Sequence, residues 1–386
     1  MTCDDGLSIE GRTLLTDGSV ARRRVVVERG TIVDVGPPDG RATVTLDERC
    51  VLSPGLIDLQ LNGGFGFDFT EDPASIPSVA SRLPSVGVTS FLPTIITSHP
   101  DRPRHADRVV SARDNDHRGA TTPGLHLEGP LLSPPQRGTH PAQWLQDDPD
   151  DIVELLSSLH RVRLVTYAPE LDTGGRLQHQ LSGSGIVGSI GHSDASFDEA
   201  SAAIDRGARM VTHLFNGMAP LHHRAPGVVG AALSRPGVTA GLIADGVHVL
   251  EPIVRTTWAL KGPDRLVLVS DGMAAMGLGD GAFVLGDVAV TVVDGIARNG
   301  DGGLAGSATT LLDGVRNLVH WGVTDLASAV HAASAVPARI IGQHDRGSID
   351  VGRRGDLIVL SDRLECVAAL VGGRPQHDPQ RLFSDH

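Results

Sequence analysis

The sequence predicts an α/β fold, a parallel (β/α)8 barrel of the TIM type that carries a small β-sandwich domain built from both chain termini. Eight short apolar or β-branched runs recur along the middle of the chain, and most of them end in a polar or glycine-containing cluster. Segments of helical character lie between most of these runs, and strands that alternate with helices form parallel sheets. The active site of such a barrel lies at the carboxyl ends of its strands.

The chain is long enough for this architecture. Its 386 residues, 40% of them hydrophobic, suffice for a barrel of about 250 residues and a smaller domain. We expect residues 1–50 to form the first part of the β-sandwich domain, residues 51–347 to form the barrel, and residues 348–386 to complete the β-sandwich domain.

The elements follow in order along the chain. Residues 24–36 predict a strand, a turn and a strand, and residues 355–360 predict another buried strand. The eight barrel strands are expected at residues 51–63, 88–97, 122–130, 162–170, 186–195, 210–218, 238–249 and 265–273. Helices are expected at residues 73–86, 148–159, 196–206 and 251–260. The glycine-rich residues 278–306 predict an inserted hairpin, and residues 309–320 predict a helix after it.

Composition excludes several classes of protein. The formal net charge of −13 disfavours an extended nucleic-acid surface. No apolar stretch approaches the roughly 20 residues that span a membrane, and the first residues lack the features of a signal peptide, so we expect a cytoplasmic protein. Cys3, Cys50 and Cys366 lack CxxC spacing, so neither a disulfide framework nor a thiolate metal site is expected.

Three candidate metal ligands follow three different predicted strands. They are Glu128 in the segment Gly-Leu-His-Leu-Glu-Gly-Pro, His192 in Gly-His-Ser-Asp-Ala and His213 in Thr-His-Leu-Phe-Asn. Each of them alone has an ordinary structural explanation, but the carboxyl ends of three barrel strands would bring all three to one mouth. Three such ligands with an open fourth position are typical of a catalytic zinc site, where the metal acidifies a water molecule. The sequence therefore predicts a metal-dependent hydrolase.

Asp271 ends the eighth predicted strand in the segment Val-Leu-Val-Ser-Asp-Gly. A carboxylate at this place can accept a proton from water and deliver it to a departing amine. The alternative is an aspartate that caps the turn before Gly272.

Ordered motifs carry a resemblance to a known family. They run from Ser-Pro-Gly-Leu-Ile-Asp at residues 53–58, through Leu-Ala-Gly-Ser at residues 304–307, to Gly355-Asp356. On these motifs the sequence resembles the N-acetylglucosamine-6-phosphate deacetylases of the amidohydrolase superfamily. The resemblance implies a barrel with a β-sandwich made from both chain ends, with Glu128, His192 and His213 as ligands of the catalytic metal. It also implies hydrolysis of N-acetyl-D-glucosamine 6-phosphate to D-glucosamine 6-phosphate and acetate, in amino-sugar catabolism and cell-wall recycling.

The resemblance also implies a set of substrate-binding residues. His248, in the Asp-Gly-Val-His motif that begins at Asp245, would bind substrate and polarise the acetyl carbonyl. Thr139 and His140 match a family motif as well, although His140 could instead be a loop histidine bonded to the backbone. The segment Leu304, Ala305 and Gly306 would line the sugar pocket, or Ser307 would simply cap the following helix.

The phosphate end of the substrate has its own signature. By resemblance, the backbone of Asn216 and Gly217 and the guanidinium of Arg224 bind the phosphate, and in this family such an arginine can come from the neighbouring subunit of a homodimer. Arginine suits this ligand because its planar fork makes two charge-assisted hydrogen bonds. The alternative for Arg224 is an exposed loop residue.

One departure from the wider superfamily concerns the number of metals. Two-metal amidohydrolases carry a His-x-His pair at the end of the first strand, whereas this chain has Gln60 and Asn62. Amides are poor zinc ligands beside imidazole, so we expect one divalent ion per subunit, Zn2+ first and Fe2+, Mn2+ or Co2+ as alternatives. Gln60 and Asn62 would either bind water or substrate, or pack the strand end.

Other functions remain in view from the sequence. They are a deacetylase for N-acetylgalactosamine 6-phosphate, a cyclic-amide hydrolase, and a sugar-phosphate-binding protein without catalysis. Arg224 and the turn at Asn216 and Gly217 argue against cyclic amides, and the complete set of candidate ligands with Asp271 argues against a non-catalytic protein. The sequence does not separate the two sugar epimers, and we expect a small sugar phosphate, not a nucleic acid or a membrane, as the partner.

Overall fold

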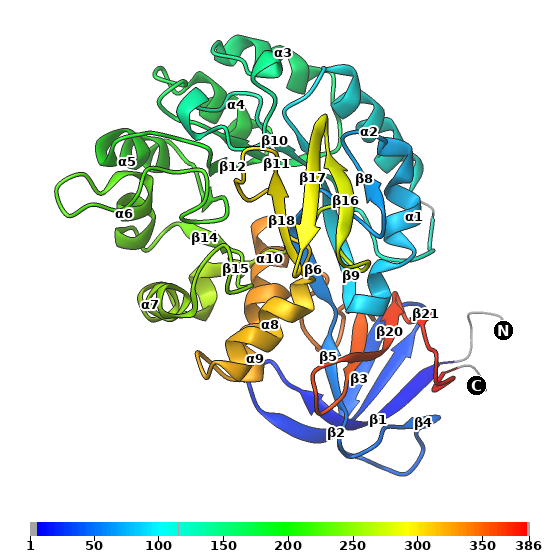
Figure 1. Ribbon diagram of the computed structural model, residues 1–386. Coiled ribbons are helices and arrows are strands. Elements are labelled where there is room, and N and C mark those ends of the chain that lie inside the picture. Colours follow the sequence, from blue (N-terminus) through cyan, green and yellow to red (C-terminus); the bar gives the residue numbers. More distant parts are fainter. Residues whose placement is uncertain (1–5, 115, 384–386) are drawn as a thin grey trace.

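The computed structural model describes residues 6–114 and 116–383. Figure 1 shows a barrel surrounded by helices, with a separate sheet below it that contains strands from the beginning (blue) and the end (red) of the chain. In the described part of the chain, no helix has the length and hydropathy needed to cross a membrane.

The barrel sheet consists of eight parallel strands in sequence order. They are β6 (Leu56–Leu61), β9 (Val88–Ile96), β10 (Leu125–Glu128), β11 (Val162–Tyr167), β12 (Val187–Ile190), β13 (Met210–Val211), β14 (Thr239–Leu242) and β15 (Leu266–Leu268). The eighth strand meets the first beyond its end, where the Asn62 amide donates to the Gly272 carbonyl (2.7 Å) and the Asp271 amide donates to the Gln60 carbonyl (3.0 Å). The predicted fold class is confirmed.

Helices cover the outside of this sheet, as Figure 1 shows. They are α1 (Ile76–Ala80), α2 (Asp101–Ala112), α3 (Pro149–Ser157), α4 (Arg176–Gly183), α5 (Phe197–Asp205), α6 (Gly227–Ser234), α7 (Glu251–Lys261), α8 (Leu311–His320), α9 (Leu326–Ala333) and α10 (Ala335–Ile340). The predicted helices 148–159, 196–206, 251–260 and 309–320 correspond to α3, α5, α7 and α8. The single helix predicted at 73–86 is wrong, because the prolines at 73, 77 and 84 divide it into α1 and two 3-10 turns, Pro73–Ser75 and Leu83–Val86.

Strands from both ends of the chain form one terminal sheet. Its order is β21-β20-β19-β5-β1-β2-β3, and β4 pairs with β1. The strands are β1 (Leu7–Leu14), β2 (Val20–Glu28), β3 (Thr31–Gly36), β4 (Val44–Thr45), β5 (Val51–Pro54), β19 (Leu357–Leu360), β20 (Cys366–Val371) and β21 (Arg374–His377).

The strand predicted at 51–63 is divided between the two sheets. β5 pairs with β19 of the terminal sheet, whereas β6 begins the barrel, and Gly55 lies at the crossing. A Cβ atom at Gly55 would lie only 2.1 Å from Oγ1 of Thr89. Only glycine therefore allows the chain to pass this close to the second barrel strand.

The insertion after the eighth strand has three antiparallel strands instead of the two of the predicted hairpin. They are β16 (Gly281–Leu285), β17 (Val288–Val293) and β18 (Ile296–Asn299), drawn in yellow in Figure 1. The turn between β16 and β17 is held by Asp68, whose Oδ2 accepts a hydrogen bond from the Gly286 amide (3.1 Å). Apolar side chains of the insertion pack on Ile96 and Met273 at the carboxyl end of the barrel.

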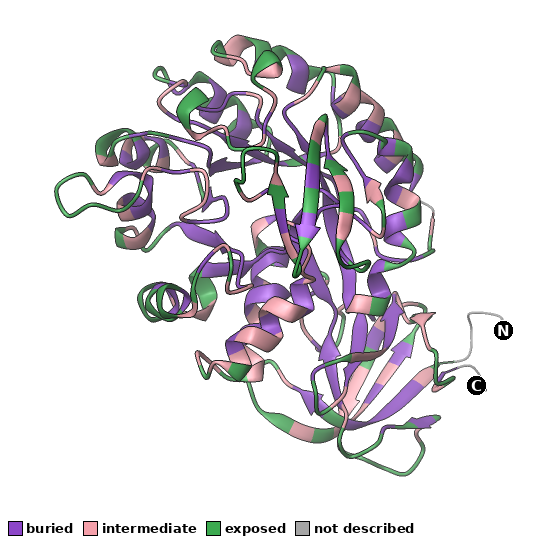
Figure 2. Cartoon of the chain, in the orientation of Figure 1, coloured by how far each residue is buried: buried purple, intermediate pink, exposed green. Residues whose placement is uncertain are grey.

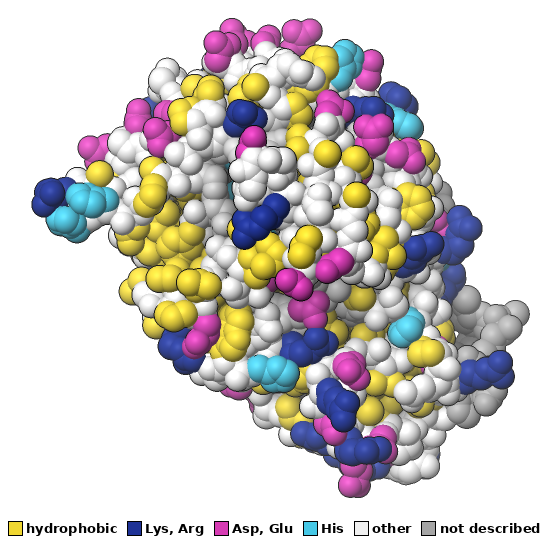
Figure 3. All heavy atoms as spheres, in the orientation of Figure 1, with side chains coloured by type: hydrophobic (Ala, Val, Ile, Leu, Met, Phe, Trp, Pro, Cys, Tyr) yellow, Lys and Arg dark blue, Asp and Glu magenta, His cyan; other side chains and the backbone are white. Residues whose placement is uncertain are grey.

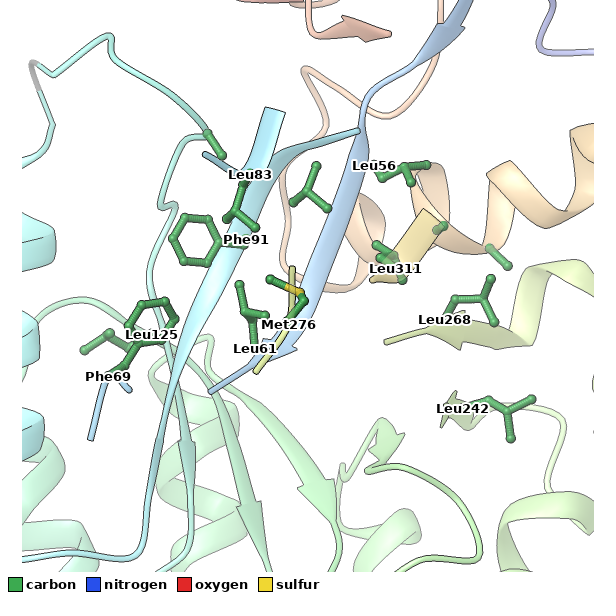
Figure 4. Packing of buried hydrophobic residues seen from close by; sticks show 14 of the residues in the cluster. Leu56, Leu61, Phe69, Leu83, Phe91, Leu125, Leu242, Leu268, Met276 and Leu311 are labelled. Atoms are coloured by element: carbon green, nitrogen blue, oxygen red, sulfur yellow. The ribbon is translucent and has the colours of Figure 1, made fainter. Parts of the chain in front are cut away.

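The apolar core lies on both sides of the barrel strands. Between the strands and the surrounding helices, one cluster joins Leu61, Leu125, Leu242 and Leu268 to Leu311 of α8 (Figure 4). A second cluster joins strand residues to side chains of α10: Ile57, Leu59, Leu92, Leu164, Val187, Met210, Ile243, Val267, Val269, Val336, Ala338 and Ile341. Figure 2 shows the corresponding pattern, with strands buried and the outer faces of the helices exposed. The polar residues at the carboxyl ends of the strands are thus held in place by a packed apolar core.

Candidate metal and catalytic site

A cavity of about 320 Å³ lies at the carboxyl ends of the barrel strands. The three predicted metal ligands and Asp271 all line it, together with part of the insertion. Its lining residues are Asn62, Ile96, Glu128, Gly138, Thr139, His140, His192, His213, Asn216, Gly217, His248, Asp271, Leu285, Gly303, Leu304 and Gly306. The sequence argument that several strand ends deliver their polar side chains to one mouth is consistent with this arrangement.

The candidate ligand atoms converge closely. Nε2 of His213 lies 3.0 Å from Oε1 of Glu128 and 3.1 Å from Nε2 of His192, and Nε2 of His192 lies 3.2 Å from Oε1 of Glu128. Tetrahedral zinc with bonds of about 2.0–2.2 Å holds its ligand atoms about 3.3–3.6 Å apart. Small rotations of these side chains would therefore suffice for a divalent ion, and their donor set of one carboxylate and two imidazoles is one that zinc accepts.

His140 lies close to the same group. Its Nε2 atom is 3.9 Å from Oε2 of Glu128, and Glu128, His140 and His192 offer one ligand atom each within 4.8 Å of one another. The Thr97 amide donates to Nδ1 of His140 (3.3 Å), so a neutral His140 carries its proton on Nε2. Because that nitrogen then has no lone pair for a metal, we prefer His213 as the third ligand.

Backbone conformation turns these side chains into the cavity. His192, His213 and Asp271 have positive φ values of 47°, 28° and 49°, although none of them is glycine. Each residue follows its strand by two or three positions, where the chain leaves the sheet. Strained conformations of this kind persist only where the surrounding structure fixes them, and they concentrate at functional sites.

Surrounding groups orient two of the candidate ligands. Nδ1 of His192 donates to the carbonyl oxygen of Gln136 (2.9 Å), which leaves the lone pair of Nε2 facing Glu128 and His213. Gln60 donates from Nε2 to Oε1 of Glu128 (3.0 Å). Among the described residues, Nδ1 of His213 and Oε1 of Gln60 are buried without a hydrogen-bond partner. Such buried atoms are unusual, and the unpaired oxygen of Gln60, whose amide holds Glu128, fits a site that is completed by an ion and water, whereas Nδ1 of His213 lies on the ring edge opposite the candidate ligand atom Nε2.

The electrostatic environment of the cavity shifts the pKa values of its two carboxylates, Glu128 and Asp271, in opposite directions. Burial alone would raise the pKa of Glu128, but the hydrogen bonds and charges of His192 and His213 outweigh it and hold this pKa well below its usual range. Burial, with the charge of Glu128, instead raises the pKa of Asp271. Glu128 is thus suited to remain an anionic ligand, and Asp271 is suited to hold a proton.

Asp271 is fixed by a side chain from the first strand. Nδ2 of Asn62 donates to Oδ1 of Asp271 (2.8 Å), while the Asp271 carbonyl accepts from the Ser307 amide (2.8 Å). The structure thereby assigns Gln60 and Asn62 contacts that the sequence left open: one amide holds Glu128 and the other holds Asp271.

His248 is oriented by Asp245. Nδ1 of His248 lies 2.6 Å from Oδ2 of Asp245, and Oδ1 of the same carboxylate accepts the amides of Val247 and His248 at 2.8 Å each. Nδ1 therefore donates to the carboxylate, and His248 lines the cavity. Asp245 is not among the lining residues, so its contribution is to hold His248.

The remaining predicted residues divide into two groups. Thr139, Asn216, Gly217, Leu304 and Gly306 line the cavity. Ala305 packs into the apolar cluster under the insertion.

Arg224 does not line the cavity of its own chain. It lies in an exposed loop before α6, and its guanidinium donates to Nε2 of the neighbouring His223 (2.8 Å).

Among the residues that were not assigned to the site from the sequence, Ile96, Gly138, Leu285 and Gly303 line the cavity, and two others orient histidines in it. Thr97 orients His140, and Gln136 orients His192. Gln136 uses its main-chain carbonyl, so its type of side chain carried no signal for this contact, whereas Thr97 uses its amide and also its side chain, whose Oγ1 lies 2.9 Å from Nδ1 of His140.

Comparisons with known proteins agree with this geometry. Residues 51–385 match the family model described as the amidohydrolase family. The chain is 38% identical to the N-acetylglucosamine-6-phosphate deacetylase of Rattus norvegicus, covering 93% of each chain, and 34% identical to that of Bacillus subtilis, covering 93% of this chain and 96% of the relative.

Solved structures show the same relationship. The N-acetylglucosamine-6-phosphate deacetylase of Pasteurella multocida superposes with a TM-score of 0.91 at 30% identity, covering 97% of this chain and 100% of that one. An aspartate-to-alanine variant of the Mycobacterium smegmatis enzyme, in complex with N-acetyl-D-glucosamine-6-phosphate, superposes with a TM-score of 0.90 at 32% identity and with the same coverage. The chain belongs to the amidohydrolase family and, within it, to the N-acetylglucosamine-6-phosphate deacetylases.

Proposed function

We propose that this protein hydrolyses the acetamido group of N-acetyl-D-glucosamine 6-phosphate and releases D-glucosamine 6-phosphate and acetate, a step of amino-sugar catabolism and cell-wall recycling. The observation that carries this proposal is the convergence of Glu128, His192, His213 and Asp271 in one cavity. Relatives that cover 93% of the chain are deacetylases of this substrate, which supports the same activity here.

Glu128, His192 and His213 would hold one divalent ion, and we propose Zn2+, with Fe2+, Mn2+ and Co2+ as alternatives. When bound, such an ion polarises the amide carbonyl and lowers the pKa of water. We propose a single ion because Gln60 and Asn62 already use their amide groups to hold Glu128 and Asp271.

Asp271 would perform both proton transfers of amide hydrolysis. It accepts the proton of the attacking water while the new carbon–oxygen bond forms, and it gives this proton to the nitrogen while the carbon–nitrogen bond breaks. The amine then leaves in protonated form instead of as an unstable anion. The bond from Asn62 to Oδ1 leaves Oδ2 of Asp271 for this task.

His248 would stabilise the charge that develops on the acetyl oxygen. The Asp245 carboxylate accepts from Nδ1, so a protonated His248 can direct its second N–H into the cavity. Thr139, His140 and the segment from Leu304 to Gly306 would contact the sugar.

The phosphate site would be completed across a homodimer. We propose that the backbone at Asn216 and Gly217 binds the phosphate together with Arg224 of the second subunit, because the loop that carries Arg224 extends away from its own cavity. Exposed apolar residues of the neighbouring loops and α7, among them Leu221 and Leu250, are 53% and 64% accessible. Figure 3 shows hydrophobic side chains gathered beside a projecting group of histidine and basic side chains. An apolar surface next to a projecting loop is suited to a symmetric contact.

We further propose that the enzyme acts in the cytoplasm. A phosphorylated sugar is an intracellular metabolite, and Cys50 and Cys366 are free thiols, as expected of a reducing compartment.

The experiment is acetate release from a panel of N-acetyl hexosamines. We expect the highest kcat/KM with N-acetylglucosamine 6-phosphate, lower values with N-acetylgalactosamine 6-phosphate, and poor turnover of both sugars without phosphate. Equal turnover of phosphorylated and unphosphorylated sugars would contradict the proposed substrate, and absence of acetate release from all of them would contradict the proposed reaction.

A further inference from the structure

A row of hydrogen-bonded polar side chains crosses the barrel directly beneath the candidate metal ligands. Its members are His126, Thr166, Thr212 and Ser189, and each of them is 0% exposed. Nε2 of His126 lies 2.8 Å from Oγ1 of Thr166, which lies 2.6 Å from Oγ1 of Thr212, which in turn lies 2.6 Å from Oγ of Ser189. The proposed chemistry uses none of these four side chains.

The row is one layer of a stacked barrel interior. Thr166, Ser189 and Thr212 each follow by two positions an apolar residue that packs against α10, namely Leu164, Val187 and Met210. Positions two apart on a strand point to the same side. The polar row therefore lies one layer above the apolar layer at α10, and Glu128, two positions after His126, lies one layer higher still.

The hydrogen bonds define one direction for every proton in the row. The carbonyl oxygen of Leu59 can only accept, so Nδ1 of His126 donates to it (3.1 Å). In a neutral imidazole Nε2 then accepts from the Thr166 hydroxyl. Thr166 has given its hydrogen to His126 and accepts from Thr212, and Thr212 accepts from Ser189. Each hydroxyl donates once, and the row runs from Ser189 to the main chain of the first strand.

The backbone links this row to the ligands. Thr166 is the register partner of Glu128, and its carbonyl accepts from the Gly129 amide (2.9 Å). Thr212 directly precedes His213, and its own amide donates to the Ile190 carbonyl (2.9 Å). A change in the side-chain bonds of Thr166 or Thr212 therefore acts on the strand ends that deliver Glu128 and His213.

We propose that His126 and the three hydroxyls are positioning residues, which hold the strand ends at the spacing that the metal requires. Breaking the row would leave a buried hydroxyl or imidazole nitrogen unpaired, and relief of that cost would displace the neighbouring strand ends. This inference rests on the proposed metal centre, since it concerns how that centre is held.

Thr166 offers a matched pair of variants. Thr166→Val keeps the volume of the side chain but removes the hydroxyl, whereas Thr166→Ser keeps the hydroxyl but removes the methyl group. That methyl group is packed, because a Cβ atom at Gly191 would lie 2.7 Å from it. If Thr166 acts on the metal centre by packing, Thr166→Ser should weaken metal binding more than Thr166→Val. If it acts by hydrogen bonding, Thr166→Val should weaken metal binding more.

The first measurement is the affinity of each protein for Zn2+, obtained by competition with a chelator of known affinity. We expect Thr166→Val to weaken binding by about 10- to 100-fold, the usual effect of losing a group that orients metal ligands, and Thr166→Ser to remain close to the wild type. The thermal midpoint of the metal-free proteins should fall in both variants, because Thr166→Val leaves a buried polar atom unpaired and Thr166→Ser loses a packed methyl group, so the Zn2+ affinities and not the midpoints separate the two roles.

The second measurement needs neither metal nor activity. The ring 15N signals of His126 in the metal-free protein, assigned by their loss in His126→Gln, should show a protonated Nδ1 and an Nε2 that accepts a hydrogen bond. The other tautomer would overturn the proton order. If the wild type binds Zn2+ and Thr166→Val binds it equally tightly, the inference is wrong and the proposed function is untouched. A wild-type protein that binds no divalent ion would overturn both.

Discussion

Replacing Asp271 with asparagine separates proton transfer from metal binding. Asparagine has nearly the same size and keeps a side-chain oxygen, so the hydrogen bond from Asn62 (2.8 Å) can be retained. Of the three candidate ligands, none forms a hydrogen bond with the Asp271 side chain in the described structure. The substitution therefore removes the proton acceptor while the ligand geometry stays in place.

The expected magnitude follows from the two transfers assigned to this one group. General acid–base catalysis by a positioned side chain contributes about 10²- to 10⁴-fold, so kcat of Asp271→Asn should fall by a factor in this range, equivalent to about 2.7–5.4 kcal/mol in the barrier. KM should change much less, because Asp271 acts mainly in the transition state.

The assay combines acetate release with elemental analysis of the same preparation. A suitable control is Asp107→Asn, since Asp107 is also a buried carboxylate but accepts the backbone amides of His160 and Arg161 outside the site. Asp107→Asn should keep its kcat. If Asp271→Asn keeps a near-normal kcat, another group moves the proton, and if it loses its metal, Asp271 is a ligand; either result would refute the reasoning.

Three further predictions concern the metal, the phosphate and a buried lysine. Chelation should remove about one divalent ion per chain together with activity, and His192→Ala or His213→Ala should prevent its return; two equally tight ions by elemental analysis would contradict a single-metal centre. Arg224→Ala should weaken binding of the phosphorylated substrate by about 2–4 kcal/mol while turnover of the unphosphorylated sugar stays nearly constant; an equal loss with both substrates would mean that Arg224 supports the fold instead. Burial lowers the pKa of Lys261 from 10.5 to about 8. Between these two pH values the unfolded chain holds a proton that the folded chain has released. The free energy of unfolding of the wild type should therefore rise with pH in this window, relative to that of Lys261→Met. Urea denaturation of both proteins at the two ends of the window measures this difference, and a constant difference would exclude the lowered pKa.

The sequence predicted those elements whose apolar pattern is strong. The barrel strands are short buried runs, and α3 and α5 begin with side-chain caps at Asp148 and Ser196, so both kinds of element were visible. By contrast, α2, α4, α6, α9 and α10 were not predicted from the sequence. In α2, only Pro103, Ala106, Asp107 and Val110 of the twelve residues are buried, and the exposed face is highly charged. The division at Gly55 was missed as well, since continuous apolar sequence on both sides of this glycine hides the passage from one sheet to the other.

The candidate site shows a similar boundary between what sequence can and cannot predict. Side chains that act by their own chemistry, such as Glu128 and Asp271, carry a signal in their residue type and in their place after a strand. Gln136 acts through its carbonyl oxygen, so any residue type could stand there. The contribution proposed for Arg224 would depend on a second subunit, and a single sequence does not indicate which surfaces of two subunits would meet.

The layered interior explains why the motifs of this chain have their particular spacing. On the third strand His126 belongs to the polar row and Glu128 to the ligands, two positions and one layer apart. On the sixth strand Met210 belongs to the apolar layer and Thr212 to the polar row, and the chain then leaves the sheet at His213 with a φ of 28°. On the third strand the alternation of side chains sets the layer of Glu128, whereas His192 and His213 lie beyond the ends of their strands and reach the cavity through their backbone conformation. A one-residue shift of the third strand would turn Glu128 to the outside of the barrel. The same packing that closes the barrel therefore also sets the position of the candidate ligand Glu128.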